Sequence, residues 1–359
     1  NNKRLFYRRV NSKKTELALY DKLIFATGSY PAMTSVPFDK KSKLYFLKSM
    51  DDAIKTDEFL KTAKNIAVIG GGMTGVEVAR ITQERGIQTT LIHRNKNLLN
   101  DYLDEPASHL LESWMNAEGM RLLLNTEVTE IGFGEENTII QTANGQKIPV
   151  DGVIFTIGFR PNSYLLNQQV ELGDSGAVIV DEYMQTSCPD VFAVGDVSTT
   201  YVNLLEKSYY LPHASDAVRD GEIAAINLLA PRQKINSSQG TYHVPMNNLV
   251  MAMTGITMRQ AVDAGYDADA VHLLNEHLDG HSPSNIWMIY ERRTHQILGL
   301  QCIGKTSDMA EYANIFSLAI QQKLKIEDIE FTDFYFEHGY KDPRGLNRIL
   351  ARLVRENER

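Results

Sequence analysis

Asn65-Ile-Ala-Val-Ile-Gly-Gly-Gly-Met-Thr-Gly-Val-Glu77 decides the fold of this chain. An apolar run, typical of a buried strand, leads into a Gly-x-Gly-x-x-Gly turn at Gly70, Gly72 and Gly75, and a helix-compatible segment follows. The first glycine permits the tight turn, the second lets a pyrophosphate approach the backbone, and the third lets the helix close on the strand. The helix N-terminus offers free N–H groups to phosphates. With a second apolar strand at residues 88–92, this order of elements predicts dinucleotide binding rather than a structural glycine turn.

The residues after that second strand select the nucleotide. A site for NAD usually places an acidic side chain there, which accepts from the ribose 2′-OH, whereas a site for NADP places a basic one near the 2′-phosphate. This chain lacks the acid and carries His93, Arg94 and Lys96 instead. A charge-assisted contact from Arg94 would contribute about 1.5–3 kcal/mol, roughly one to two powers of ten in affinity. The pattern favours NADPH, with use of both cofactors or an ordinary solvated loop as the alternatives.

Composition restricts the class of protein. The chain has 359 residues, of which 43% are hydrophobic and 23% charged, so we expect a soluble protein of two or three domains. A net charge of −8 gives no support to a nucleic-acid partner, and no apolar run reaches the ~18 residues that a membrane-spanning helix needs. The two cysteines cannot form a disulfide framework, which favours the cytoplasm. No metal site is predicted.

The rest of the chain alternates strands and helices and then changes character. Residues 16–28 are predicted to form a strand that ends in a glycine turn, and residues 191–196 an apolar strand that runs into Gly-Asp. Residues 231–240 are the best linker candidate, because they combine Pro, Gly, Asn and Ser. Beyond this linker the pattern predicts an α+β module with an antiparallel sheet, distinct from the nucleotide unit.

Three short signals outside the glycine-rich turn fit a second dinucleotide. Ala26-Thr27-Gly28 ends a predicted strand and allows close backbone approach. Gly195-Asp196 places a carboxylate where a polyol hydroxyl could donate to it. Leu211-Pro212-His213-Ala214 opens a predicted helix, whose N–H groups could face an electron-rich ring edge. Each alone is more typical of an ordinary turn, but their order around a nucleotide unit favours a flavin.

With these motifs in place, the chain resembles the pyridine nucleotide–disulfide oxidoreductase family over essentially its whole length. The motifs that carry the resemblance are Tyr20–Gly28, Gly70–Glu77, Thr156–Asn162, Val191–Asp196, Gly240-Thr241, Thr254–Thr257, Gln260–Gly265 and Thr332–Phe336, with Asp342-Pro343 and Leu346-Asn347. The late motifs are similar to the branch that contains NADH oxidases, NADH peroxidases and coenzyme A disulfide reductases.

The resemblance implies an α/β fold. Two Rossmann-like dinucleotide-binding domains would be present, the NAD(P) domain inserted in the FAD domain, together with a C-terminal α+β dimerisation domain. The FAD-binding domain would comprise residues 1–45, a partial first segment, and residues 159–235. The NAD(P)-binding domain would comprise residues 46–158, and the dimerisation domain residues 236–359. The expected cofactor-binding residues are Ala26, Thr27, Gly28, Gly70, Gly71, Gly72, Met73, Thr74, Gly75, Glu77, His93, Arg94, Lys96, Gly158, Gly195, Asp196, Pro212, His213 and Ala214.

The sequence departs from the family pattern at its reactive centre. The family begins with a separate strand and Gly-x-Gly-x-x-Gly segment for the ADP part of the flavin, followed by a reactive cysteine, and neither is found in these 359 residues. Cys188 precedes a proline and Cys302 sits in an apolar strand, so buried structural thiols are the better interpretation of both. Tyr335 and Tyr340 are candidate proton donors or thiol-positioning groups, with aromatic packing at a subunit interface as the alternative.

The expected activity is that of an FAD-dependent NAD(P)H oxidoreductase, a homodimer by resemblance. Electrons would pass from NADPH or NADH through FAD to a cysteine-based centre, which would reduce a small-molecule acceptor: oxygen, peroxide or a coenzyme A-type disulfide. Two alternatives stay open. One is a cysteine-free flavin reductase that passes electrons to a carrier protein, and the other is a non-catalytic nucleotide-binding fragment.

Overall fold

The computed structural model describes residues 3–166, 168–246, 249–275, 284–304, 308–334 and 345–358. The chain divides into two compact units. The first unit comprises residues 1–30 and 159–238, and the second unit residues 31–158 and 239–359. The domain boundaries predicted from the sequence stay a prediction.

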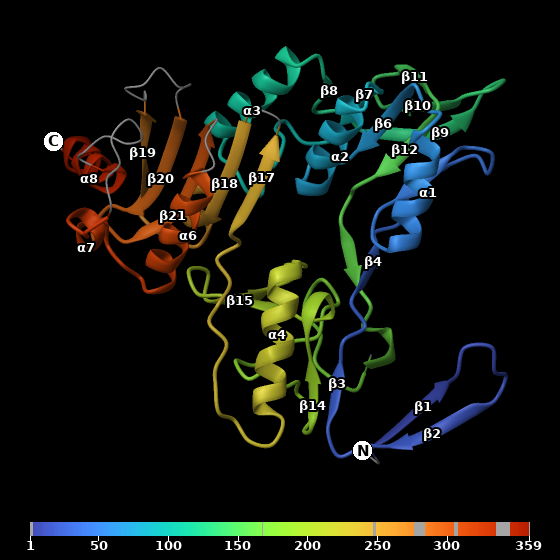
Figure 1. The fold of residues 1–359 in the computed structure, drawn as a ribbon, viewed down its shortest axis with the longest axis horizontal. Helices are drawn as coiled ribbons and strands as arrows, with labels where there is room; N and C mark the ends of the chain where they lie inside the picture. Colours follow the sequence, from blue (N-terminus) through green and yellow to red (C-terminus); the bar gives the residue numbers. More distant parts are fainter. Residues whose placement is uncertain are drawn as a thin grey trace. The chain divides into compact units, whose positions relative to one another are not determined.

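A five-stranded parallel sheet forms one part of the second unit (Figure 1). Its strands lie in the order β5 (Leu44–Phe46), β12 (Gly152–Phe155), β6 (Asn65–Ile69), β7 (Gln88–Ile92) and β8 (Arg121–Leu123). The helices of this part are α1 (Met50–Leu60), α2 (Met73–Glu84) and α3 (Glu105–Ala117). Ile66, Val68 and Leu91 are fully buried, which explains the unbroken apolar runs of β6 and β7. The predicted strand, glycine turn, helix and second strand are all present.

A three-stranded antiparallel sheet adjoins the parallel one. It has the order β11 (Lys147–Val150), β10 (Thr138–Thr142) and β9 (Val128–Phe133). Ile131, Ile140 and Ile148 share one apolar cluster with Val153 and Phe155 of β12. The small sheet is therefore packed on the nucleotide sheet through a common core.

The C-terminal part of the second unit is the α+β module that the sequence predicts. Its five antiparallel strands lie in the order β17 (Tyr242–Met246), β18 (Leu249–Gly255), β21 (Ile297–Gly304), β20 (Ser284–Glu291) and β19 (Ala268–Asn275). Its helices are α5 (Met258–Asp263), α6 (Asp308–Gln321), α7 (Ile326–Glu330) and α8 (Leu346–Asn357).

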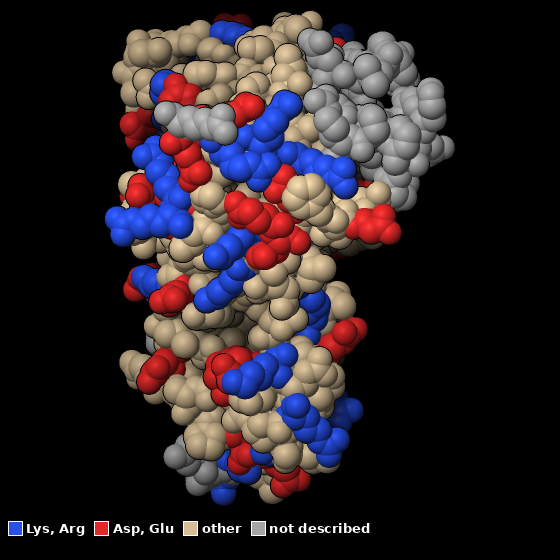
Figure 2. Space-filling model, turned by 90° about the vertical axis from the view of Figure 1, so that its left-hand side faces the viewer, with Lys and Arg blue, Asp and Glu red and all other residues tan. Residues whose placement is uncertain are grey.

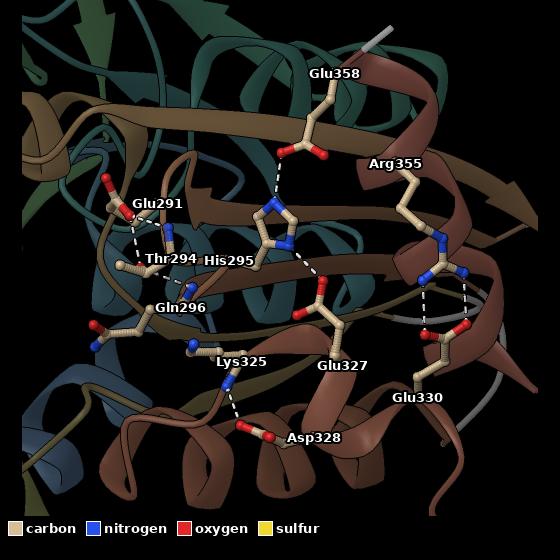
Figure 3. A network of polar contacts seen from close by, with 10 residues as sticks. All are labelled: Glu291, Thr294, His295, Gln296, Lys325, Glu327, Asp328, Glu330, Arg355 and Glu358. Atoms are coloured by element: carbon tan, nitrogen blue, oxygen red, sulfur yellow. Dashed lines mark hydrogen bonds and ion pairs between the residues drawn. The ribbon is translucent and has the colours of Figure 1, made fainter.

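Ion pairs fasten the last helices of this module. Figure 3 shows the His295 ring between the carboxylates of Glu327 and Glu358, and Arg355 forms a bidentate pair with Glu330.

On the face drawn in Figure 2, basic and acidic side chains lie next to one another. This face therefore has the mixed charge of an ordinary solvated surface rather than the single sign of a phosphate-binding one.

The nucleotide sheet and the C-terminal sheet share a hydrophobic core. Leu98, Leu99 and Leu111 belong to the same buried cluster as Met251 and Ile303. Figure 1 shows α3 beside β17 and β18, and the ring of Tyr102 meets that of Tyr242 edge-on at 5.0 Å. This shared core explains why residues 31–158 and 239–359 form one unit.

The first unit consists of short strands around α4 (Ala214–Asn227). Its strand pairs are β1 (Arg4–Arg8) with β2 (Thr15–Leu19), β3 (Leu23–Phe25) with β14 (Val191–Ala193), β4 (Ser29–Pro31) with β13 (Phe159–Pro161), and β15 (Thr200–Val202) with β16 (Lys207–Tyr209). Single turns of 3₁₀ helix occur at η1 (Tyr164–Leu166) and η2 (Gly195–Val197).

Two predicted strands are shorter than expected. Residues 16–28 do not form one strand, because the backbone turns at residues 20–22 between β2 and β3. Lys22 in this turn pairs with Asp190, while Leu23 N–H donates to the Asp190 carbonyl at 2.9 Å, so the chain leaves the β1–β2 hairpin and enters a pair with β14. The strand predicted for residues 191–196 ends at Ala193, and Gly195-Asp196 begins η2 instead.

Candidate functional site

The glycine turn after β6 is fixed by close contacts that only glycine allows. Gly70 has φ +121°, and a Cβ there would lie 2.4 Å from the carbonyl oxygen of Thr156. A Cβ on Gly75 would lie 1.8 Å from the Gly70 oxygen. Thr156, at the end of β12, also donates its hydroxyl to the Gly70 carbonyl at 3.0 Å. The turn and the start of α2 are therefore pressed together as a nucleotide-binding strand–turn–helix requires.

The entrance to α2 is open and has no side-chain cap. Gly72 is the N-cap residue, no side chain hydrogen-bonds there, and a Cβ on Gly72 would meet nothing within 4 Å. Met73 and Thr74 form the first turn, which contains no acidic residue. N–H groups are thus available to an anion, and the space in front of them can receive it. Glu77 lies beyond the first turn, and its assignment to cofactor binding stays a prediction.

His93, directly after β7, is half-buried and contacts the glycine loop. The Gly71 N–H donates to His93 Nδ1 at 3.0 Å, and His93 Nε2 lies 3.2 Å from Asn100 Oδ1. Burial lowers the pKa of His93, and the neighbouring Arg94 lowers it further, against the effect of Asn100. The ring is therefore neutral at pH 7, which suits a residue that positions the loop better than a cation that binds the 2′-phosphate.

Arg94 and Lys96 have different surroundings. Arg94 is exposed, has no hydrogen-bond or ion-pair partner among the described residues, and lines a cavity of about 410 Å³. The other lining residues are Asn95, Asn125, Thr126, Glu127, Ala143 and Asn144. Lys96 Nζ instead pairs with Glu105 Oε1 at 2.5 Å. Of these two cationic side chains, that of Arg94 is the one without an ion-pair partner among the described residues, and it is therefore available to a ligand.

The Ala26-Thr27-Gly28 turn of the first unit is bound to the segment after β13. Gly28 has φ +66°, and its carbonyl accepts from the Asn162 N–H at 2.9 Å. The Thr27 hydroxyl donates to the Asn162 carbonyl at 2.7 Å. A Cβ on Gly28 would meet nothing within 4 Å, so the backbone is accessible at this turn, where Ala26 is exposed.

Gly195 and Asp196 lie at η2, which packs against α4. The Gly195 N–H donates to Asp220 Oδ2 at 3.1 Å, and Ser29 Oγ donates to Asp196 Oδ2 at 2.8 Å. Burial raises the pKa of Asp220 to about 6. The hydrogen bonds orient the Gly-Asp turn, as an acceptor for a polyol hydroxyl requires.

The helix that follows begins at the predicted place. His213 is the N-cap of α4, with Pro212 before it and an exposed Ala214 as the first helical residue. No side chain caps this end, and the His213 ring contacts the Ser215 hydroxyl at 2.7 Å. The N–H groups of this 14-residue helix are therefore available in the same way as those of α2.

The remaining predicted residues have mixed outcomes. Gly158 adopts φ +96°, and its carbonyl accepts from the Ala32 N–H at 2.9 Å. Tyr335 and Tyr340 lie outside the described residues. Cys302 is fully buried in β21, and burial raises the pKa of its thiol, so it has the environment of a structural cysteine. Cys188 is half-buried, with its Sγ 3.9 Å from the Pro189 carbonyl.

Sequence reasoning assigned no role to three residues that hold the loops: Thr156, Asn100 and Asp220. Thr156 could have been found, because it directly follows a strand whose carboxyl end lies beside that of β6 in a parallel sheet. Asn100 and Asp220 had no local signal. Their partners lie 7 and 25 residues away in the sequence and are brought close by the loop before α3 and by α4.

The described residues contain neither a candidate metal site nor a membrane-spanning helix. Within the described ranges, no group of three or more His, Cys, Asp or Glu side chains is placed to hold a metal ion. No helix in the described part of the chain is long and apolar enough to span a membrane.

Comparison with known proteins agrees with this geometry. Residues 1–221 match the pyridine nucleotide-disulphide oxidoreductase family, and residues 244–336 match the dimerisation domain of that family. An NADH oxidase of Enterococcus faecalis is 33% identical over 348 residues, covering 96% of this chain and 78% of that protein. An NAD(P)H coenzyme A polysulfide/persulfide reductase of Pyrococcus horikoshii is 25% identical over 346 residues, covering 94% and 76%.

Two solved structures share the fold. One is an engineered water-forming NADPH oxidase bound to NADPH, with a TM-score of 0.95 and 28% identity, covering 99% of this chain and 80% of that one. The other is the water-forming NADH oxidase from Lactobacillus brevis bound to NADH, with a TM-score of 0.94, 28% identity and the same coverage.

The chain belongs to the pyridine nucleotide-disulphide oxidoreductase family. Within that family it is an NAD(P)H-dependent flavoprotein oxidoreductase with the predicted α/β fold and C-terminal dimerisation domain.

The residues present fit both cofactors. The open Gly72 position and the uncapped α2 suit a pyrophosphate, and the turn at Gly28 leaves backbone accessible, while Gly195 packs closely against Ala217 of the uncapped α4. The flavin and the nicotinamide, when bound, supply hydride transfer. The protein supplies loops of fixed shape, hydrogen-bond donors at two helix ends, and a carboxylate oriented at Asp196.

Proposed function

We propose that this enzyme prefers NADPH and that Arg94 contacts its 2′-phosphate. The supporting observation is the environment of Arg94: an exposed guanidinium at the end of β7, with no partner among the described residues, at the edge of a cavity. No acidic side chain follows β7 to accept from a ribose 2′-OH. His93 is occupied by Gly71 and Asn100, and Lys96 by Glu105, so Arg94 carries the preference.

A structural relative supports the same reasoning. The engineered NADPH oxidase is a five-substitution mutant of the NADH oxidase from Lactobacillus brevis, and its substitutions remove an aspartate and introduce two arginines. An aspartate repels a 2′-phosphate and an arginine pairs with it. The His93–Lys96 segment has the composition that this change produces, with arginine present and aspartate absent.

Arg94→Ala tests the proposal. We expect the Kd for NADPH to rise by roughly tenfold or more, because one charge-assisted contact to phosphate is lost, while the Kd for NADH changes little. Arg85→Ala is the matched control, because it removes the same charge at the far end of α2, where Arg85 pairs with Asp57. Equal weakening of both cofactors by Arg94→Ala would show that Arg94 does not read the 2′-phosphate.

For the oxidative half of the reaction, we propose that electrons pass to a cysteine-based centre that reduces oxygen, peroxide or a coenzyme A-type disulfide. The NADH oxidase supports oxygen as an acceptor, and the coenzyme A polysulfide/persulfide reductase supports a coenzyme A-linked sulfur acceptor. Cys302 and Cys188 are poor candidates for the centre, since one is fully buried and the other adjoins a proline turn. Oxygen uptake per NADPH oxidised, with and without added peroxide or disulfide, distinguishes the acceptors.

The proposed assembly is a cytoplasmic homodimer. The match of residues 244–336 to a dimerisation domain supports two copies. Light scattering of the purified protein at micromolar concentration gives the mass directly. A monomer mass across the whole concentration range would contradict the proposal.

A further inference from the structure

A chain of hydrogen bonds runs from the glycine loop to the C-terminal module. It begins at the Gly71 N–H, which donates to His93 Nδ1 at 3.0 Å. His93 Nε2 lies 3.2 Å from Asn100 Oδ1, and Arg259 of α5 donates to the Asn100 carbonyl at 3.3 Å. All four residues belong to the second unit.

The geometry defines the protonation state of the ring. A backbone N–H can only donate, so Nδ1 of His93 must be the unprotonated acceptor. Nε2 then carries the proton and donates to Asn100 Oδ1, the same oxygen that accepts from Asn95 Nδ2 at 3.0 Å. The ring is thus a neutral tautomer with both nitrogens in use.

The same loop fixes Gly71 on its other side. The Leu99 N–H donates to the Gly71 carbonyl at 2.9 Å, so both main-chain groups of Gly71 are bound. A Cβ on Gly71 would lie 2.6 Å from the His93 ring and 2.6 Å from Leu98. The ring is therefore packed against the glycine that directly precedes the α2 N-cap.

The C-terminal module holds the far end of the loop through α5. Arg259 Nη2 donates to Asp101 Oδ1 at 3.0 Å, and Gln260 Nε2 to the Asp101 carbonyl at 3.3 Å. The Asp104 carboxylate accepts from the Met258 N–H at 3.1 Å. Residues 100–104 are therefore anchored to α5 of the C-terminal module as well as to the nucleotide sheet's own loop.

We propose that His93 is a positioning residue: its neutral ring, supported by Asn100 and α5, holds the Gly71 N–H and with it the loop that receives the pyrophosphate. His93 contacts no group that distinguishes the two nicotinamide cofactors. Both NADH and NADPH therefore depend on it to the same degree. The proposal rests on the assignment of this loop to the pyridine nucleotide in the proposed function.

Cofactor affinity should change with pH in a definite direction. Burial and Arg94 lower the pKa of His93, while Asn100, Asp101 and Glu112 act in the opposite direction. When the ring is protonated, Nδ1 becomes a donor and can no longer accept from Gly71. Affinity for both cofactors should therefore fall as the pH drops below the ordinary histidine range, about 6.5. A cationic His93 bound to the 2′-phosphate would give the opposite result, stronger NADPH binding at low pH.

Two nearly isosteric variants separate these roles. His93→Asn keeps an amide acceptor at the position of Nδ1, whereas His93→Gln keeps a polar atom near Nε2 and loses the acceptor facing Gly71. Using the flavin-loaded full-length protein, Kd for NADH and NADPH is measured by anaerobic titration between pH 5.5 and 8, together with KM and kcat.

We expect His93→Gln to raise Kd and KM for both cofactors by roughly tenfold, because a buried N–H loses its acceptor, with kcat little changed. His93→Asn should recover most of this loss and remove the weakening below pH 6.5. Arg259 is the exposed last member of this series of hydrogen bonds. Arg259→Ala should weaken the binding of both cofactors equally, by roughly two- to threefold.

Two outcomes overturn the proposal: unchanged affinity in His93→Gln, or a loss confined to NADPH. The NADPH proposal fails separately, through an Arg94→Ala variant that does not discriminate between the cofactors. If His93→Gln is obtained without flavin, Arg259→Ala and the pH dependence of the wild-type Kd still test the inference, because neither changes the glycine loop itself.

Discussion

The glycine loop of the second unit and the Gly-Asp turn of the first unit are both held through a glycine N–H, but by different acceptors. Gly71 donates to the neutral ring of His93, which comes from the neighbouring strand, and Gly195 donates to the carboxylate of Asp220, which comes from the helix that follows. Burial lowers the pKa of His93 and raises that of Asp220 to about 6.

This difference has a consequence in acid. A protonated imidazole has no lone pair for Gly71, whereas a protonated carboxyl keeps a carbonyl oxygen that can accept from Gly195. The glycine loop should therefore be sensitive to acid and the Gly-Asp turn tolerant of it. The predictions below test this contrast and the packing behind it.

The largest effect is expected from Gly75→Ala. Its methyl group would lie 1.8 Å from the Gly70 oxygen, so the backbone must move. We expect the free energy of unfolding of the second unit to fall by at least about 3 kcal/mol, with loss of NAD(P)H binding. Chemical denaturation and cofactor titration measure the two effects.

Gly72→Ala is the matched control for that variant. A Cβ on Gly72 meets nothing within 4 Å, and its φ of −81° is ordinary for alanine. Stability should be preserved while cofactor affinity falls, because the methyl group occupies the space that the pyrophosphate approaches. Equal stability of the two variants would mean that the strand and helix are not in close contact at Gly75.

A middle-sized effect is expected for Asp220→Asn. Because the folded pKa of Asp220, about 6, exceeds its unfolded value of 3.8, the native state binds the proton more tightly and wild-type stability falls as pH rises from 4 to 6. The asparagine does not titrate, so the variant should gain stability over wild type across this range, by roughly 1–3 kcal/mol. If the difference in free energy of unfolding between the variant and the wild type does not change with pH, the raised pKa of Asp220 is excluded as a cause of pH-dependent stability.

How far the sequence predicts the molecule differs between the two regions. The strand–turn–helix at residues 65–84 and the C-terminal α+β module are confirmed, because local apolar periodicity and glycine spacing specify them. The division of residues 16–28 into β2 and β3 was not predicted, since it depends on pairing with β14, more than 160 residues away.

The site shows the same limit. The sequence identifies three basic residues after β7, but their different surroundings could not be predicted from it. His93 turns inward because Gly71 has no side chain to exclude its ring, Lys96 meets Glu105 on α3, and Arg94 alone faces the cavity. These outcomes depend on which partner the fold brings near each side chain, and sequence spacing does not contain that information.

The smallest effect is expected at the C-terminal helices, where His295 pairs with Glu327 and Glu358 (Figure 3). Burial opposes the charge, but the two glutamates prevail and raise the pKa of His295. This raised pKa contributes stability that is fully present below the unfolded value of 6.5 and is lost as pH rises through the folded pKa. Since these side chains are partly exposed, Glu358→Gln should lower stability by less than about 1 kcal/mol, and only in acid. A larger loss at pH 8 than at pH 6 would contradict this sign.

The most direct test of the account is anaerobic reduction of the bound flavin in the wild-type protein, produced from its native reading frame. Flavin absorbance near the ~450 nm band is followed by stopped flow with NADPH and with NADH across a range of concentrations. We predict reduction by both cofactors, with a Kd for NADPH at least roughly tenfold below that for NADH. Tighter binding of NADH, or the same Kd for both, would contradict the assignment of Arg94 to the 2′-phosphate.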